Sequence, residues 1–197
     1  MENKKRFVSL RRVLERFGVF EETVEKTLGK KTLGSYSINQ DVDYYNAQKT
    51  AEEIESMSEA YMSQGTGKTH ELIGELGKKV ESVIAALKQK DREKVVSAFN
   101  SCKHVVWNVY GEIESMSSRD SMTRDSLGSR SASKSLSRVL DAITVAESEY
   151  ADCEDVIMKC EKARERALRE YSTLIDGASR DEEIAAIDAL ESMVGED

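Results

Sequence analysis

The stretch Leu136–Leu174, which reads LSRVLDAITVAESEYADCEDVIMKCEKARERALREYSTL, decides the fold class of this chain. Apolar or aromatic residues recur in it at alternating steps of three and four, the spacing that places them on one stripe of an α-helix. The stripe consists of Leu136, Val139, Ile143, Ala146, Tyr150, Cys153, Ile157, Cys160, Arg164, Ala167, Tyr171 and Leu174, and only Arg164 breaks its apolar character. The pattern predicts one long helix, roughly 60 Å from end to end at about 1.5 Å per residue. Because it must bury a narrow apolar stripe, we expect it to pack against other long helices, from the same chain or another.

Most of this stripe also forms a candidate seam for a homodimer or for a helical partner protein. The seam residues are Leu136, Val139, Ile143, Tyr150, Ile157, Tyr171 and Leu174. After the stripe, Gly177 is a natural helix C-cap. Ser179 and Glu182 match a capping box, which predicts a short acidic helix within residues 178–197.

The composition fits long helices throughout the chain. The 197 residues include no proline, which breaks helices, and 34% of them are charged. Apolar stripes at helical spacing run from Ile73 to Leu87 and from Val95 to Met116. The sequence therefore predicts an all-α fold, in which residues 41–177 form a bundle or coiled coil of long antiparallel helices.

A thin apolar stripe, which includes Val42 and Tyr45, predicts a further helix from Asp41 to about Ser63.

Two segments interrupt the predicted helices. The segment KQKDREK at 88–94 is either a solvated turn or a one-residue phase shift within a continuous helix.

The other interruption, YMSQGTGKTH at Tyr61–His70, contains the GTGKT ending of a phosphate-binding loop. Such a loop needs a glycine five residues before Gly67, where this chain has Met62. The loop must also follow a buried strand, whereas the preceding AEEIESMSEAYM is polar and helix-forming. We expect no nucleotide site, but a glycine-rich break between two helices at Ser63–Thr69.

Residues 1–29 are predicted to hold a basic amphipathic helix over residues 4–20, followed by a loop at 30–40. Its apolar residues recur at helical spacing: Phe7, Leu10, Val13, Leu14, Phe17 and Phe20. Most of its basic residues lie on the other side. The helix either packs on its own domain or lies in a membrane interface.

Residues 115–137 are rich in serine, with ten serines among 23 residues, interleaved with arginine and lysine. This composition predicts a weakly structured connection over residues 115–135. Arg130 precedes Ser133 by three residues and Lys134 precedes Ser137 by three, so both serines are candidate phosphorylation sites. A passive polar linker is the other interpretation.

The sequence shows no catalytic constellation, so we expect a protein that is not an enzyme and has no cofactor or metal. His70 and His104 lack partners at triad or metal-ligand spacing. Cys102, Cys153 and Cys160 also lack metal-ligand spacing, and are expected to be buried apolar residues in a reducing, cytoplasmic compartment. No apolar run is long enough to span a bilayer, and the charged N-terminus is not that of a secretory signal.

The charge is unevenly distributed along the chain. The net charge of −8 argues against nucleic-acid binding. Residues 1–20 nevertheless carry a net charge of +4, and residues 176–197 carry −7. This asymmetry suggests that one end of the chain meets an anionic surface.

The segment RRVLERFG, followed by EKTLGKKTLGSYSINQDVDYY, resembles the entry to a BAR-type domain of the arfaptin and islet-cell-autoantigen branch. The matching residues are Arg16, Phe17 and Gly18, or Leu28, Gly29, Lys30 and Lys31, and then Asp41. SQGTGKT stands where that family turns from its first helix to its second, and AESEYADCEDV (146–156) is similar to its later segments. The resemblance implies a dimer of antiparallel helical hairpins that binds anionic, curved membrane.

Two functions follow from these patterns. The first is a BAR-like peripheral membrane protein, in which apolar residues of the N-terminal helix insert and basic residues hold anionic head groups. Its candidate membrane-binding residues are Lys4, Lys5, Phe7, Leu10, Arg11, Arg12, Leu14, Arg16 and Phe17. The second is a helical adaptor that binds a partner chain through the seam at 136–174, with no lipid contact. An N-terminal helix packed on the long helices would favour the second.

Overall fold

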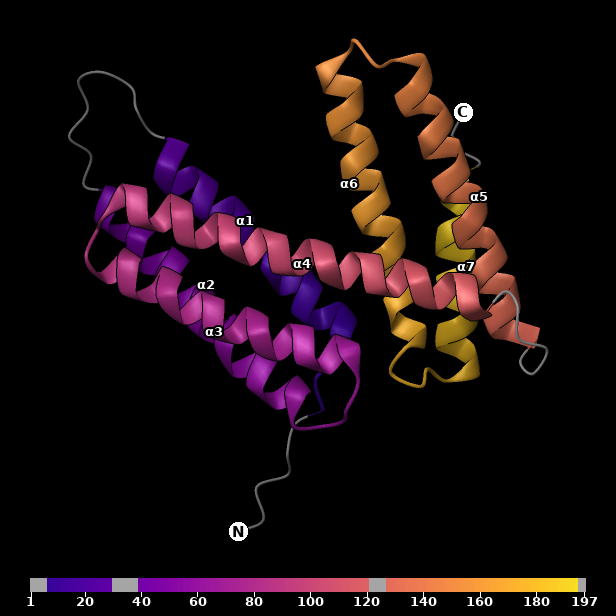
Figure 1. The fold of residues 1–197 in the computed structure, drawn as a ribbon, viewed down its shortest axis with the longest axis horizontal. Helices are drawn as coiled ribbons and strands as arrows, with labels where there is room; N and C mark the ends of the chain where they lie inside the picture. The colour runs from indigo at the N-terminus through magenta and orange to yellow at the C-terminus, as the bar shows by residue number, and fades with distance from the viewer. Residues whose placement is uncertain (1–6, 30–38, 121–126, 195–197) are drawn as a thin grey trace. The chain divides into compact units, whose positions relative to one another are not determined.

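The computed structural model describes residues 7–29, 39–120 and 127–194, and every regular element in these ranges is a helix (Figure 1). The elements are α1 (Leu10–Gly29), α2 (Asn39–Met62), α3 (Lys68–Lys88), α4 (Arg92–Asp120), α5 (Leu127–Glu149), α6 (Glu154–Tyr171), the 3-10 helix η1 (Ser172–Leu174) and α7 (Arg180–Val194). The predicted all-α class is therefore confirmed. The longest of these helices, α4, has 29 residues.

The chain forms two compact units, residues 1–109 and 110–197, and the boundary lies within α4. The apolar stripe of α4 contributes to both units, since Val95, Cys102 and Val109 are buried in the first and Ile113 in the second. The stripe predicted for α3, from Ile73 to Leu87, is buried as well.

In the first unit, α1 packs on α2 and α2 packs on α3. Phe17 and Phe20 of α1 meet Phe99 of α4, with ring centroids 5.9 and 5.4 Å apart respectively. These aromatic pairs add to the apolar burial and join the first helix of the unit to its last.

Part of the stripe predicted for α2 is wrong. Val42 and Tyr45 are exposed, whereas Ala47, Ala51 and Ile54 are buried. At 3.6 residues per turn, Val42 and Tyr45 lie on the opposite face from these three residues. Small side chains of this buried stripe, such as Ala47 and Ala51, allow neighbouring helices to approach closely, and the large side chain of Tyr61 is buried near the end of the same helix.

The N-terminal helix is also displaced from the prediction. α1 begins at Leu10 and continues to Gly29, instead of covering residues 4–20, because its buried positions continue through Val24. Residues 1–6 and 30–38, which hold Lys4, Lys5 and most of the expected loop, lie outside the described residues. α2 begins at Asn39, two residues before the expected Asp41.

Both predicted interruptions have a clear structure. The glycine-rich break is confirmed, since α2 ends at Met62 and α3 begins at Lys68. The 88–94 segment contains a turn and not a phase shift, because Lys90 has a φ of 52° and its N–H donates to the carbonyl of Leu87 at 3.0 Å. Asp91 then accepts a hydrogen bond from the N–H of Lys94 at 3.2 Å and so caps α4.

The prediction of one continuous helix over 136–174 is wrong. α5 ends at Glu149, residues 150–153 turn, and α6 returns from Glu154 to pack on α5. The sequence at the turn fits the break, because the acidic residues Glu154 and Asp155 are favourable in the first turn of a helix. The stripe is therefore folded into a hairpin.

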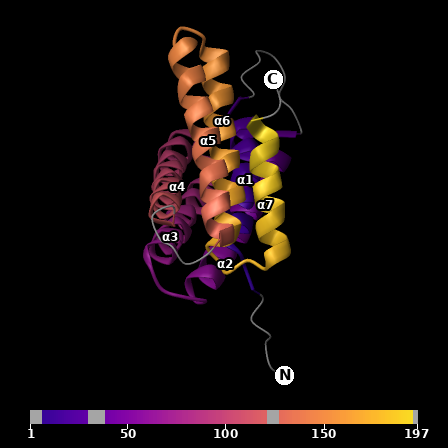
Figure 2. The ribbon, with the colours of Figure 1, turned by 90° about the vertical axis from the view of Figure 1, so that its right-hand side faces the viewer.

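α7 completes the second unit by packing on α5 and α6 (Figure 2). Gly177, with a φ of 80°, ends the preceding turn. The predicted capping box is confirmed, since the N–H of Ser179 donates to Glu182 at 2.7 Å and the N–H of Glu182 donates to Ser179 at 3.4 Å. Ala186 and Leu190 of α7 are buried.

The serine-rich connection predicted over residues 115–135 is largely helical. α4 continues to Asp120 and α5 begins at Leu127, while residues 121–126 lie outside the described residues. Serine is small enough to pack where two helices meet, and Ser133 of α5 donates to the carbonyl of Ser117 of α4 at 2.7 Å. Tertiary packing therefore overrides the weak helix propensity of serine.

Candidate functional site

The apolar residues expected to insert into a membrane lie mostly in the core of the first unit. Leu10, Leu14 and Phe17 are buried, and Phe17 is only 4% exposed. Phe7, which precedes α1, is 64% exposed. The apolar face of the N-terminal helix is therefore covered by its own unit.

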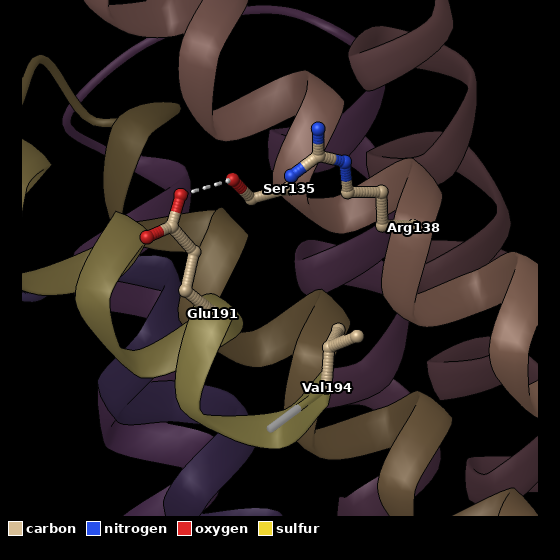
Figure 3. Close-up of a pocket in the computed structure, with 4 residues that line it drawn as sticks. All are labelled: Ser135, Arg138, Glu191 and Val194. Carbon is tan, nitrogen blue, oxygen red and sulfur yellow. Dashed lines mark hydrogen bonds between the residues drawn. The ribbon is translucent and has the colours of Figure 1, made fainter.

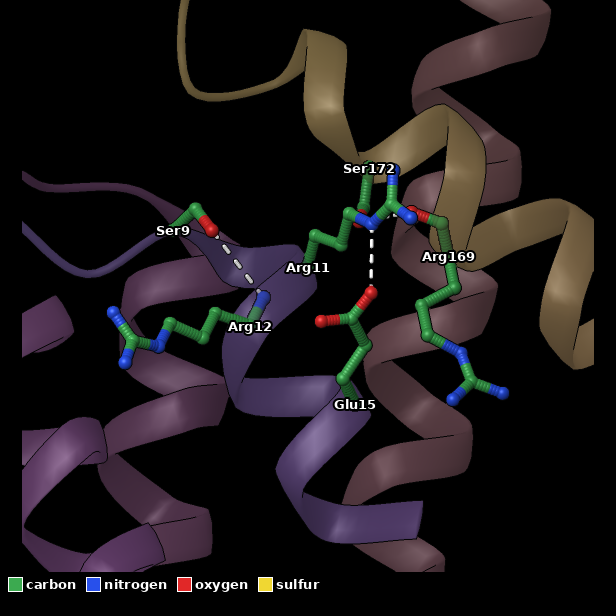
Figure 4. A network of polar contacts seen from close by, with 6 residues as sticks. All are labelled: Ser9, Arg11, Arg12, Glu15, Arg169 and Ser172. Atoms are coloured by element: carbon green, nitrogen blue, oxygen red, sulfur yellow. Dashed lines mark hydrogen bonds and ion pairs between the residues drawn. The ribbon is translucent and has the colours of Figure 1, made fainter. Parts of the chain in front are cut away.

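The basic residues of α1 are partly neutralised by carboxylates. Figure 4 shows Arg11 directed toward Glu15 one turn later, and their ion pair measures 2.8 Å. Arg16 forms an ion pair with Glu53 of α2. Arg12 is exposed, and its backbone N–H donates to the hydroxyl of Ser9 at 3.3 Å.

The residues of the candidate seam differ in burial: some lie in the core of the second unit, and others are half-buried or exposed. Leu136, Val139 and Ile143 of α5 and Tyr171 of α6 are buried in the second unit. Ile157 and Leu174 are half-buried. Tyr150, at the turn, is exposed. The chain thus uses the inner part of the stripe for its own core.

Arg164, the charged position in the stripe, has an ion-pair partner that the periodicity did not reveal. Its guanidinium lies 2.8 Å from the carboxylate of Glu147, so the pair links α6 to α5. Both side chains are about 30% exposed. The pair lies partway along the hairpin. The buried residues Leu136, Val139, Ala167 and Tyr171 lie further from the turn than this pair.

We define the hairpin tip as residues 145–158, which comprise the end of α5, the turn and the start of α6. Within the tip no residue is buried. Val145, Tyr150 and Met158 are 56%, 54% and 50% exposed respectively. In Figures 1 and 2 this end of the hairpin extends beyond α7. The tip is therefore a two-helix surface that lacks the third helix present further along the hairpin.

The tip is also strongly acidic. It contains five carboxylates and no lysine or arginine; the carboxylates belong to Glu147, Glu149, Asp152, Glu154 and Asp155. In the sequence this stretch contributes to the seam and to the BAR-type resemblance, and no acidic turn is predicted there. The run ESEYADCED was the signal that was missed, because like charges so closely spaced are expected at a helix end or turn.

The two candidate phosphorylation sites differ in access. Ser133 is 2% exposed and its hydroxyl is already engaged with Ser117, so a kinase cannot reach it in the folded unit. The side chain of Ser137 is exposed on α5.

A shallow pocket of about 320 Å³ lies between α5 and α7. It is lined by Ser135, Arg138, Glu191 and Val194 (Figure 3). Ser135 donates to the carboxylate of Glu191 at 3.3 Å. The lining holds the cation of Arg138 and the carboxylate of Glu191. None of these lining residues is a histidine that could activate the hydroxyl of Ser135, so the four residues do not form a Ser-His-Asp triad.

Acidic residues also gather on the first unit. Burial, followed by the neighbouring carboxylates of Glu81, Glu59 and Glu52, raises the pKa of Glu55 above its ordinary value of 4.5. Over the described ranges, no group of three or more histidine, cysteine or acidic side chains is arranged to hold a metal ion.

The expectation of three buried cysteines is wrong for one of them. Cys102 and Cys160 are buried, but Cys153 is exposed because it lies in the turn of the hairpin tip. Burial raises the pKa of the Cys102 thiol to about 12, so this thiol is unreactive in the folded chain.

None of the helices in the described part of the chain is long and apolar enough to cross a bilayer. Of the residues that carry the BAR-type resemblance, Phe17 lies in the core of the first unit, and Lys30 and Lys31 lie outside the described residues. No protein-family model, curated protein or solved structure matches this chain.

Proposed function

We propose that this chain is a non-enzymatic helical adaptor, which binds a partner protein through the hairpin tip. The observation that carries the proposal is the exposure of Val145, Tyr150 and Met158 near the turn of a hairpin whose stripe residues further along, such as Leu136 and Tyr171, are buried. Tyrosine and methionine are enriched at protein interfaces, because they supply large or adaptable apolar area.

The alternative of a lipid-binding helix draws less support from α1. Leu10, Leu14 and Phe17 cannot insert into a bilayer without leaving the core of the first unit. The hairpin tip is unsuited to the same role, because its carboxylates would be repelled by anionic phospholipid. A protein partner satisfies both observations.

The test is quantitative capture of partners by the full chain and by two matched variants. The tip variant is Val145→Ser/Tyr150→Ser/Met158→Ser. The control variant, Val42→Ser/Tyr45→Ser/Met62→Ser, removes the same three residue types from similarly exposed positions of the first unit. Captured proteins are then purified and their binding is measured by calorimetry.

We expect a partner that binds the wild type and the control variant equally and binds the tip variant at least about tenfold more weakly, as for the loss of a hot spot. Equal binding by the tip variant and the wild type would remove the basis for the proposal. Circular dichroism on each variant checks that the helices are retained.

A BAR-like membrane protein is the second candidate, and it is favoured by the exposure of Phe7 and Arg12 near the start of α1. An aromatic and a cation at one edge suit a lipid interface. Deleting residues 1–20 would remove core side chains, so a suitable variant is Phe7→Ser/Arg12→Gln. Salt-sensitive co-sedimentation with anionic liposomes, lost in this variant, supports this candidate, and no sedimentation of the wild type at low salt rules it out.

A further inference from the structure

We infer that a pocket between the start of α1 and the end of α2 binds a small monocarboxylate that carries a short apolar chain. This inference goes beyond the proposed adaptor function and does not depend on the hairpin tip. Three features of the first unit carry it: an apolar part of the pocket lining, a wall that is held by hydrogen bonds, and an arginine that has no carboxylate partner.

The pocket has a volume of about 280 Å³, which is near the small end of the range for ligand sites. Its lining combines apolar and polar side chains: Val8, Arg12, Ser56, Met57, Ala60, Ser63 and Gln64. Val8 is buried, and Met57 and Ala60 are half-buried, so these three side chains supply an apolar surface. Methionine is flexible and adapts to the shape of an apolar group. The pocket therefore suits one short apolar chain and is too small for a large cofactor.

One wall of the pocket is held in place by the side-chain amide of Gln64. Its oxygen accepts a hydrogen bond from the backbone N–H of Val8 at 3.3 Å, and its nitrogen donates to the carbonyl of Ala60 at 3.0 Å. These bonds join the segment before α1 to the end of α2. A lining that is ordered before the ligand arrives loses little conformational entropy on binding.

The start of α1 positions Arg12 at this pocket. The hydroxyl of Ser9 caps the helix by accepting a hydrogen bond from the backbone N–H of Arg12 at 3.3 Å. The side chain of Arg12 extends away from Arg11 and Glu15 (Figure 4). The guanidinium therefore lies apart from the neighbouring ion pair of α1.

The charge of Arg12 is not matched by a carboxylate. Arg11 and Arg16 each form an ion pair with a glutamate, whereas the guanidinium of Arg12 has no hydrogen-bond or ion-pair partner among the described residues. No described residue of the lining is acidic. A guanidinium binds a carboxylate through two parallel hydrogen bonds, and the hydroxyl of Ser56 can donate a third. One cation beside an apolar surface selects an anion with an apolar chain over a neutral compound.

Hexanoate is the probe, and two related compounds test its two parts. Hexanamide keeps the chain and removes the charge, whereas acetate keeps the charge and removes most of the chain. Each compound is titrated into the isotope-labelled full chain, and its Kd is measured from backbone chemical shifts by NMR, which detects the weak binding expected of so small a ligand. The shifts should saturate and should be largest within residues 8–12 and 56–64.

Three variants locate the binding. Arg12→Gln removes the cation of the pocket. The control, Arg92→Gln, makes the same change of charge at an exposed arginine at the start of α4. Ala60→Leu keeps Arg12 and fills the pocket with a larger side chain. The NMR spectrum of each variant checks that the fold is retained, and the comparison of the two arginine variants decides the result if Ala60→Leu disturbs it.

We expect hexanoate to bind the wild type and Arg92→Gln within about twofold of each other, and to bind Arg12→Gln and Ala60→Leu at least about fivefold more weakly. Hexanamide and acetate should each bind the wild type at least about fivefold more weakly than hexanoate does. Equal binding by the two arginine variants would overturn the inference. Equal binding of acetate and hexanoate would also overturn it, because it would show a general attraction of anions, and so would the absence of saturable shifts with hexanoate.

A membrane surface could also engage Arg12, so anionic liposomes form a separate arm of the test. Salt-sensitive sedimentation of the wild type without saturable binding of hexanoate would overturn the pocket inference in favour of the second candidate function. Failure of the adaptor function is distinguishable from both outcomes. The Val145→Ser/Tyr150→Ser/Met158→Ser variant changes only the second unit, and it is expected to bind hexanoate as the wild type does.

Discussion

The most direct test of the fold is to truncate two phenylalanines that sequence periodicity places on the same helix face. Phe17 is 4% exposed, and its ring centroid lies 6.0 Å from that of Phe20 and 5.9 Å from that of Phe99. Phe7 is 64% exposed. Phe17→Ala therefore removes a buried ring and its contacts with two aromatic rings, which costs about 3–5 kcal/mol. Phe7→Ala is expected to change the free energy of unfolding by no more than about 0.5 kcal/mol.

Urea unfolding distinguishes these outcomes. Trp107 is the sole tryptophan and belongs to the first unit, so its fluorescence follows that unit while far-ultraviolet circular dichroism follows both. If Phe17→Ala unfolds the first unit outright, Phe17→Leu, which keeps apolar volume but loses the ring pairs, should lower stability by about 1–2 kcal/mol. A change of less than about 0.5 kcal/mol for Phe17→Ala would refute the assignment of this residue to the core.

Three further predictions test other parts of the structure. Cys153 should react with thiol reagents in the folded chain, while Cys102, with its raised pKa, should react only after unfolding, as counted by mass spectrometry. Glu55 has a raised pKa when folded, so its stabilising contribution is present below 4.5 and is lost as the pH rises through the raised value. Glu55→Gln should therefore raise the melting temperature slightly at neutral pH and not below 4.5, and a shift of the same size at both would contradict this sign. Ser133→Asp should destabilise the second unit by about 3 kcal/mol or more, because it buries an unpaired charge, whereas Ser137→Asp should change stability by no more than about 0.5 kcal/mol; equal effects in thermal melts would argue against the packing of α5 on α4.

Many of the helix boundaries follow from local residues. The glycines before Lys68 end one helix and permit the next, and Ser179 and Glu182 cap α7 as expected of their spacing. Such features depend on backbone conformation and on hydrogen bonds within a few residues, so a short window of sequence is sufficient to predict them. The 88–94 segment marks the limit of this approach, since the sequence allows both a turn and a phase shift there, and the structure shows the turn, with Lys90 in the left-handed conformation.

The candidate site was less accessible to prediction. Of its exposed apolar residues, Tyr150 belongs to the predicted seam together with Leu136 and Tyr171, which lie in the core, whereas Val145 and Met158 lie off the stripe and the spacing does not single them out. The spacing of three and four identifies the residues that share a helix face, and it carries no information about what covers that face. For the same reason the spacing leaves open whether Phe17 is a core residue, the default interpretation, or a membrane anchor.

By itself, the sequence determined that this protein is built from helices, where most of them break, and which side chains form their apolar stripes. Only the tertiary structure decided that residues 136–174 fold back at Tyr150–Cys153, and that α1 is covered by α2 and α4. Closing a hairpin over a turn of four residues costs little entropy, whereas joining a second chain costs translational and rotational freedom. The inner part of the stripe is therefore buried within its own chain, and the tip, which α7 does not reach, stays exposed.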